Sequence, residues 1–114
     1  MAKDIDINIV RNGACSVVHI QGDIDLHTSP TVRATILDLF ENRGQERVIL
    51  DLKAVDYMDS SGIASLVEGL QEAKKKKARL ILSCLNEAPR HVLELTRLTG
   101  VFEITKTVED ALRL

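Results

Sequence analysis

The chain of 114 residues is long enough to bury one hydrophobic core and too short for two, so we expect a single domain across residues 1–114. Hydrophobic residues make up 45% and charged residues 28% of the sequence, a composition typical of a folded rather than a disordered chain. A formal net charge of -2, with 3% aromatic residues and no tryptophan, offers neither a general attraction to phosphate backbones nor a stacking platform for bases. We therefore expect no nucleic-acid partner.

The amino terminus and the cysteines indicate the cellular compartment. Charges lie in the first six residues, where a signal peptide needs an apolar run, and no apolar stretch approaches the roughly 20 residues of a membrane span. Cys15 and Cys84 are isolated in apolar stretches and fit neither a metal-ligand spacing nor a disulfide framework, so we expect reduced core thiols. Together these features predict a cytoplasmic protein without membrane contact.

An antiparallel hairpin is predicted at the amino-terminal end. Residues 4–9 alternate between polar side chains and isoleucine, the pattern of a strand with one solvated face, which favours an edge position. Asn12-Gly13 is a hairpin turn signal, and residues 15–20 form the expected partner strand. Gly22 then ends the pairing.

A helix and a central strand are predicted next. Ser29 supplies an N-cap and Pro30 the first helical position, and apolar residues recur at helical spacing until Gly44. Residues 48–52 are apolar except for Asp51, as expected of a strand covered on both faces.

A second helix is predicted to begin at Ser60 or Ser61. It runs into four consecutive lysines, Lys74 to Lys77. Positive charge complements the carboxyl end of a helix dipole, so we interpret the lysines as a solvated helix end rather than a ligand-binding patch.

Residues 80–85 form the next expected buried strand. A third helix follows, capped by Asn86, with Pro89 in its first turn and Gly100 as its stop. Beyond it, a short strand is possible at residues 101–104, and a last short helix is expected to open with Thr107 and Asp110, which resemble a capping box.

The resulting order of elements is β-β-α-β-α-β-α-β-α. Alternation of strands and helices after an initial hairpin predicts right-handed crossovers and a mostly parallel sheet with one antiparallel edge. The fold class is therefore a mixed α/β domain, with a sheet of four to five strands, an N-terminal antiparallel hairpin and about four helices.

The connection between the central strand and the second helix is the strongest candidate for function. Functional groups collect outside the carboxyl ends of strands in such sheets, where helix N-termini present free backbone N–H groups. Asp59-Ser60-Ser61-Gly62 lies there and is suited to hold an oxyanion or a phosphate. The alternative is that serine acts only as an N-cap and the segment is nothing but a helix start. These residues alone do not decide between the two interpretations.

Three segments, in matching order, resemble the STAS domain of bacterial anti-sigma factor antagonists. They are Gly22-Asp23-Ile24-Asp25, Val48-Ile49-Leu50-Asp51-Leu52 and Tyr57-Met58-Asp59-Ser60-Ser61-Gly62-Ile63, and the likeness continues to the late Leu98-Thr99-Gly100-Val101 turn. The resemblance implies the STAS fold and a regulatory protein rather than an enzyme, with no cofactor.

The family resemblance also implies a switch. The hydroxyl residue after the aspartate is the family's phosphoacceptor, which corresponds to Ser60. The unphosphorylated form binds an anti-sigma factor that is also a serine kinase and so frees a sigma factor. The kinase then phosphorylates the antagonist, and a metal-dependent serine phosphatase restores it. We expect a monomer, and we expect the partner-binding residues to be Asp23, Asp25, Asp59, Ser61, Gly62 and Ile63.

The physical chemistry of a phosphate agrees with this scheme. A phosphate adds roughly -1.5 to -2 charges, which the folded domain tolerates at a helix N-terminus. It would lie beside Asp56 and Asp59, near Asp23 and Asp25, and repel a surface fitted to the neutral serine. For Asp23 and Asp25, turn capping and kinase contact are equally good interpretations.

The sequence departs from the family pattern at Ala64, where many relatives have a second glycine, and at Lys74 to Lys77, where relatives often have a glycine turn. Ala64 should stiffen the first turn of the second helix, a change that could tune partner choice. The histidines indicate no metal site: His19 alternates within a strand as a partly buried residue, and His91 fits a helix surface.

Three alternatives remain at this level. The first is a STAS subunit of another machine, such as a lipid-transport ATPase or a stressosome. The second is an enzyme with Ser60 as nucleophile, which would need a neighbouring base, although the chain has no Gly-x-Ser-x-Gly elbow. The third is a nucleotide-binding domain, although the glycine-rich phosphate cradle with its lysine is absent.

Overall fold

A five-stranded mixed sheet organises the chain in the computed structural model, which describes residues 5–114. Its spatial order follows the sequence: β1 (Asp6–Asn12), β2 (Cys15–Gln21), β3 (Arg47–Ala54), β4 (Arg79–Ser83) and β5 (Glu103–Thr105). The pair β1–β2 is antiparallel and every later pair is parallel. The predicted fold class is confirmed, including the edge position of the first strand.

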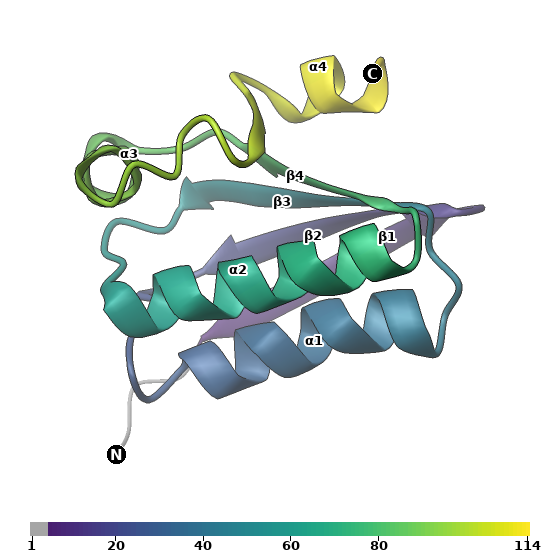
Figure 1. Cartoon of the computed structure of the whole chain (residues 1–114), viewed down its shortest axis with the longest axis horizontal. Coiled ribbons are helices and arrows are strands. Elements are labelled where there is room, and N and C mark those ends of the chain that lie inside the picture. Colours follow the sequence, from purple (N-terminus) through teal and green to yellow (C-terminus); the bar gives the residue numbers. More distant parts are fainter. Residues whose placement is uncertain (1–4) are drawn as a thin grey trace.

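Four helices complete the domain: α1 (Ser29–Glu41), α2 (Ser60–Lys75), α3 (Glu87–Leu95) and α4 (Val108–Leu112). Figure 1 shows α1 and α2 side by side beneath one face of the sheet and α4 above the other face. Helix α3 lies at the left-hand end of the sheet, where its buried Leu93 joins the same core as α1 and α2. The order of elements is therefore the predicted one.

The alternation of side chains along each strand divides the hydrophobic residues between the two faces. The main core, between the sheet and helices α1 and α2, contains Val18, Leu50 and Leu82, with Ile36 and Leu66 from the helices. A second, smaller cluster on the opposite face holds four buried residues: Val17, Ile49, Ile81 and Ala111. Among the elements of residues 5–114, α4 is the one that covers that cluster.

Backbone conformation sets several element boundaries that differ from the prediction. The hairpin loop is Gly13-Ala14 rather than Asn12-Gly13, because Asn12 still pairs with Cys15 and Gly13 takes the positive φ of 64°. Strand β4 ends at Ser83 because Cys84 has a left-handed φ of 60°.

The helix ends differ by similar amounts. Thr28, not Ser29, is the N-cap residue of α1. Helix α3 ends at Leu95 instead of continuing to Gly100, since Arg97 already turns the chain at a φ of 61°. The cap of α4 is confirmed: Thr107 Oγ1 accepts from the backbone N–H of Asp110 at 3.0 Å.

The lysine run is a solvated helix end, as predicted. All four lysines are exposed; α2 ends at Lys75, and Lys77 leaves the helix with a left-handed φ of 59°. The two cysteines are free, as predicted, but both are half-buried rather than fully in the core, and Cys15 packs against the smaller cluster. Asp4, part of the predicted alternating strand, lies outside the described residues.

Candidate functional site

Two loops at the carboxyl end of the sheet are joined by backbone hydrogen bonds. The loop after β2 and the loop after β3 meet at a parallel bridge between Ile24 and Met58. The N–H of Ile24 donates to the carbonyl of Tyr57 at 3.0 Å, and the N–H of Asp59 donates to the carbonyl of Ile24 at 3.2 Å. This pairing holds the Asp23–Asp25 segment next to the start of α2.

Asp59 caps α2. One oxygen of its carboxylate accepts from the backbone N–H of Ser61 at 2.9 Å and of Gly62 at 3.2 Å. The segment is thus a helix start, but a serine cap is wrong because the aspartate performs that role. Ser60 is exposed, and within residues 5–114 its hydroxyl has no hydrogen-bond partner. The Ser60 hydroxyl is therefore not needed for the helix cap and is accessible for modification.

Gly62 allows the two loops to approach each other. A Cβ at this position would lie 2.6 Å from Met58 Cγ and 2.8 Å from the carbonyl oxygen of Ile24. The absence of a side chain at Gly62 thus lets the backbone of the Ile24 loop pack against the start of α2. Gly62 and Ile63 are buried, whereas Asp23 is exposed and Asp25, Asp59 and Ser61 are half-buried. Partner contact by these six residues stays a prediction.

The two aspartates of the β2 loop differ. Asp25 Oδ1 accepts from the backbone N–H of His27 at 2.9 Å and of Thr28 at 3.1 Å, which makes Asp25 a turn-capping residue. The Thr28 N–H, followed by that of His27, lowers the pKa of this carboxyl. Asp23 is exposed, and its backbone carbonyl, not its carboxylate, accepts from the Thr28 hydroxyl at 2.7 Å.

Asn86 braces the β3 loop, a role that sequence reasoning missed. It occupies the N-cap position of α3 as predicted, yet its side chain makes no capping hydrogen bond. Instead, Nδ2 donates to the carbonyls of Lys53 at 2.8 Å and Val55 at 2.9 Å. No local signal reports this contact, because the partners are more than 30 residues apart in the sequence.

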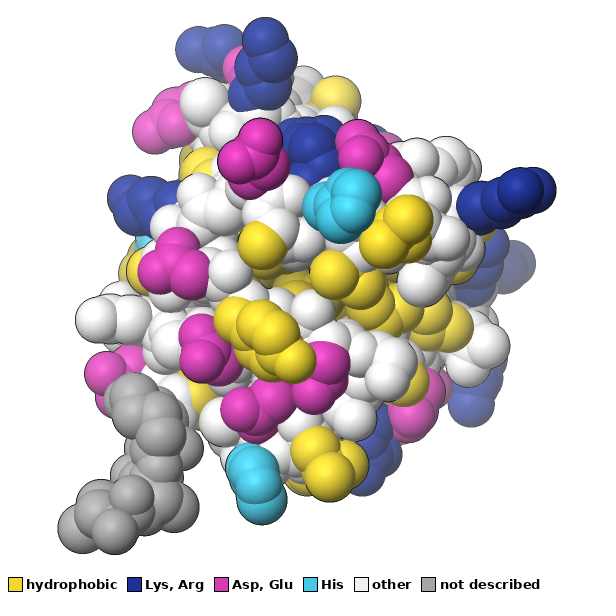
Figure 2. All heavy atoms as spheres, turned by 90° about the vertical axis from the view of Figure 1, so that its left-hand side faces the viewer, with side chains coloured by type: hydrophobic (Ala, Val, Ile, Leu, Met, Phe, Trp, Pro, Cys, Tyr) yellow, Lys and Arg dark blue, Asp and Glu magenta, His cyan; other side chains and the backbone are white. Residues whose placement is uncertain are grey.

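The surface around Ser60 is both acidic and apolar. Leu26 and Tyr57 are exposed by 69% and 49%. Figure 2 shows acidic and hydrophobic side chains sharing the middle of this end of the molecule, with lysine and arginine mainly toward its margins. Such a surface suits a partner protein with matching apolar and basic groups.

Neither a metal-binding cluster nor a membrane-spanning helix is found within residues 5–114. That range holds no group of three or more His, Cys, Asp or Glu side chains arranged to bind a metal ion. His19 is half-exposed and bonded to Asp51, and His91 is a surface residue of α3 near Glu94, which fits the structural roles predicted for both. No helix in the described part of the chain has the length and apolar character to cross a bilayer.

Comparison with known proteins agrees with this geometry. Residues 6–111 match the model of the STAS domain. The anti-sigma-B factor antagonist of Bacillus subtilis is 28% identical over 110 residues, which cover 96% of this chain and 99% of the relative.

Solved structures share the fold. An anti-sigma factor antagonist from Mycobacterium paratuberculosis superimposes with a TM-score of 0.84 at 26% identity, covering 96% of this chain and 92% of the other. The unphosphorylated anti-sigma factor antagonist SpoIIAA gives a TM-score of 0.75 over 95% of this chain and 96% of its own. At 19% identity, that second likeness concerns the fold alone.

Proposed function

Because the chain belongs to the STAS domain family, we propose that it is an anti-sigma factor antagonist switched off by phosphorylation of Ser60. The unphosphorylated form binds an anti-sigma factor with serine kinase activity, and a sigma factor is released. A metal-dependent serine phosphatase reverses the modification. In this role the protein is a cytoplasmic monomer and not an enzyme, and its relative in Bacillus subtilis carries the same kind of name.

The observation that carries the proposal is the division of labour between Asp59 and Ser60. The aspartate caps α2, so a kinase can modify the exposed serine without removing any hydrogen bond that the helix requires. A new phosphate would lie at the positive end of the helix dipole, where the fold tolerates it. The modification is therefore expected to change binding more than stability.

The surroundings of Ser60 support an off switch. A phosphate would add roughly -1.5 to -2 charges to a surface that already exposes Asp23 and Asp56. A partner that docks on the neutral serine would meet concentrated negative charge at its contact surface. Loss of binding follows from like-charge repulsion and from the cost of desolvating the phosphate.

A phosphorylation assay tests this proposal. The chain is incubated with ATP and the anti-sigma kinase encoded nearest its gene, and phosphate is located by intact mass and peptide mapping. We expect one phosphate on wild type and on the control Ser61→Ala, none on Ser60→Ala, and weaker kinase binding by the phosphorylated protein. No phosphate despite an active kinase would reject the switch and favour a STAS accessory subunit of another complex.

A further inference from the structure

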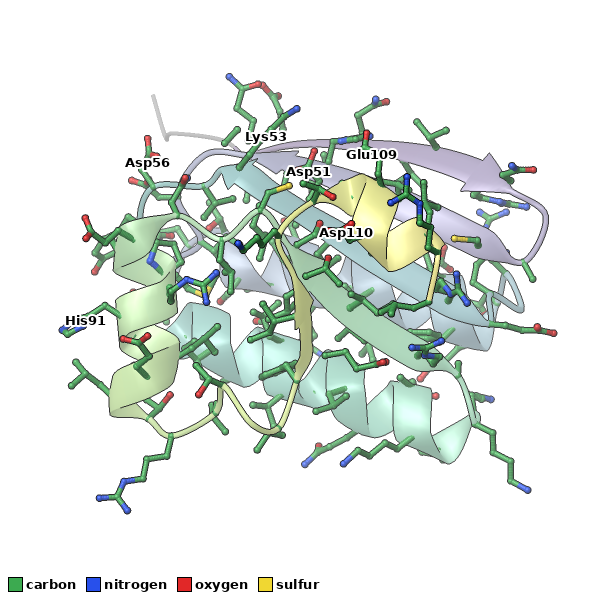
Figure 3. The ribbon with its side chains drawn as sticks, turned by 90° about the horizontal axis from the view of Figure 1, so that it is seen from above. Asp51, Lys53, Asp56, His91, Glu109 and Asp110 are labelled. Carbon is green, nitrogen blue, oxygen red and sulfur yellow. The ribbon has the colours of Figure 1, made fainter. Side chains whose placement is uncertain are left out.

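A row of polar side chains crosses the sheet on the face opposite α1 and α2. The strand register aligns Asn8 with His19, His19 with Asp51, Asp51 with Ser83, and Ser83 with Thr105, one residue from each strand. The apolar cluster beneath α4 lies on the same face. Its strand residues Val17, Ile49 and Ile81 come two positions before His19, Asp51 and Ser83. Helix α4 thus covers the apolar part of this face and leaves the polar row beside it; Figure 3 shows Asp51 next to α4 and Lys53 farther along β3.

Asp51 is the unusual member of the row because it is a carboxylate only 3% exposed in a central strand. Its Oδ2 accepts from His19 Nδ1 at 2.7 Å, and its Oδ1 accepts from the backbone N–H of Lys53 at 3.2 Å. Burial by itself would raise the pKa of Asp51, but the His19 hydrogen bond and the Lys53 N–H outweigh it and the pKa is lowered. Since an apolar residue here would avoid the desolvation cost, a fixed charge at this position suggests a use other than stability.

A cavity of about 360 Å³ opens above these side chains, within the size range of small-molecule sites. Asn8, His19 and Asp51 belong to the polar row, and Asp6, Gln21 and Lys53 come from the positions next to it toward the carboxyl end of the parallel strands. The lining therefore combines two amides and an imidazole with charged groups of both signs.

From this lining, we propose that the cavity binds a small zwitterion the size of a free amino acid. Lys53 offers an ammonium that is 74% exposed and lies 4.0 Å from Asp51 Oδ2. Asp6 offers an exposed carboxylate two strands away, about 10 Å between the backbones by sheet spacing. The ligand carboxylate pairs with Lys53 and its ammonium with Asp6, because a molecule of one charge would be repelled by one of the two.

The site also lies directly before the loops that surround Ser60. Gln21 and Ala54 are the last residues of β2 and β3, and the N–H of Gly22 donates to the carbonyl of Ala54 at 3.1 Å. A bound ligand would therefore contact both strands that lead to the Ile24–Met58 bridge. Ligand binding itself does not depend on phosphorylation, so the proposal stands apart from the proposed switch.

Amide NMR titration of the ¹⁵N-labelled full chain tests the proposal. The probes are glycine, L-glutamate, L-lysine and γ-aminobutyrate at millimolar concentration, with acetate and methylammonium as single-charge controls. We expect saturable shifts confined to residues 6–8, 19–21 and 51–54 with at least one zwitterion and with neither control.

Two lysine variants sharpen the test. Lys53→Gln should weaken the binding at least about tenfold, as expected for a lost charge-assisted hydrogen bond, while the exposed control Lys106→Gln should not change it. The proposal is overturned if none of the four zwitterions gives saturable shifts there, or if Lys53→Gln binds as tightly as wild type.

Discussion

The two faces of the sheet are formed by the same strands, yet they have different physical roles. One face is covered by α1 and α2, two helices of 13 and 16 residues, and the main core lies between them and the sheet. The opposite face has a five-residue helix, four buried cluster residues and a polar row beside them. Most of the stability should come from the first face, which leaves the second free to carry charged groups.

Truncation of neighbouring core residues should show the largest contrast between the faces. Leu50 and Ile49 are adjacent and fully buried but point to opposite faces. We expect Leu50→Ala to lower the free energy of unfolding by about 3–5 kcal/mol and Ile49→Ala by about 2–3 kcal/mol, because the short α4 can settle into the space left by Ile49. Urea denaturation measures both, and an equal or larger loss for Ile49→Ala would contradict the contrast.

A smaller effect is expected where the closed face meets the Ser60 loop. Gly62→Ala should cost about 1–3 kcal/mol of unfolding free energy, because the added Cβ would overlap Met58 and the Ile24 carbonyl. Gly100→Ala is the matched control: a Cβ there meets nothing within 4 Å, and we expect a change within about 0.5 kcal/mol. If both variants have wild-type stability, the packing between the loops is looser than described.

The smallest effect concerns acid stability on the open face. The pKa of Asp51 is lower in the folded than in the unfolded chain, so the unfolded state binds more protons at low pH. The stabilisation by Asp51 is therefore present above its unfolded value of about 4 and is lost as the pH falls through its folded value.

Asp51→Asn should accordingly lose less stability than wild type between about pH 5 and the acid limit of the folded state. Urea denaturation at a series of pH values measures the slope. The Leu50→Ala variant, which removes no titrating group, should keep the wild-type slope. Parallel curves for wild type and Asp51→Asn would show that Asp51 makes no such contribution.

The order of elements was predictable because its signals are local. The alternation in residues 4–9, the glycine of the hairpin and the Thr107 cap each depend on residues only a few positions apart. The errors in the predicted ends of β4 and α3 are also local. Cys84 and Arg97 adopt left-handed conformations that end these elements early, and neither residue type favours that conformation.

Contacts between distant residues were beyond single-sequence reasoning. The likeness to STAS domains directed attention to Ser60, but no spacing rule identifies Asn86 as the brace of the β3 loop or pairs His19 with Asp51 across 32 positions. The polar row depends on strand register, so it becomes visible only when five strands are aligned.

The cap on α2 also bears on how such a protein evolves. Since the carboxylate of Asp59 accepts the two hydrogen bonds that cap α2, the side chain of Ser60 is not needed for the cap. Exchange of Ser60 for threonine or alanine should therefore change the stability of the fold little, while under the proposed switch it would change or abolish the response to a kinase. If the proposed switch operates, evolution could alter it by changing one codon, without a compensating mutation elsewhere in the domain.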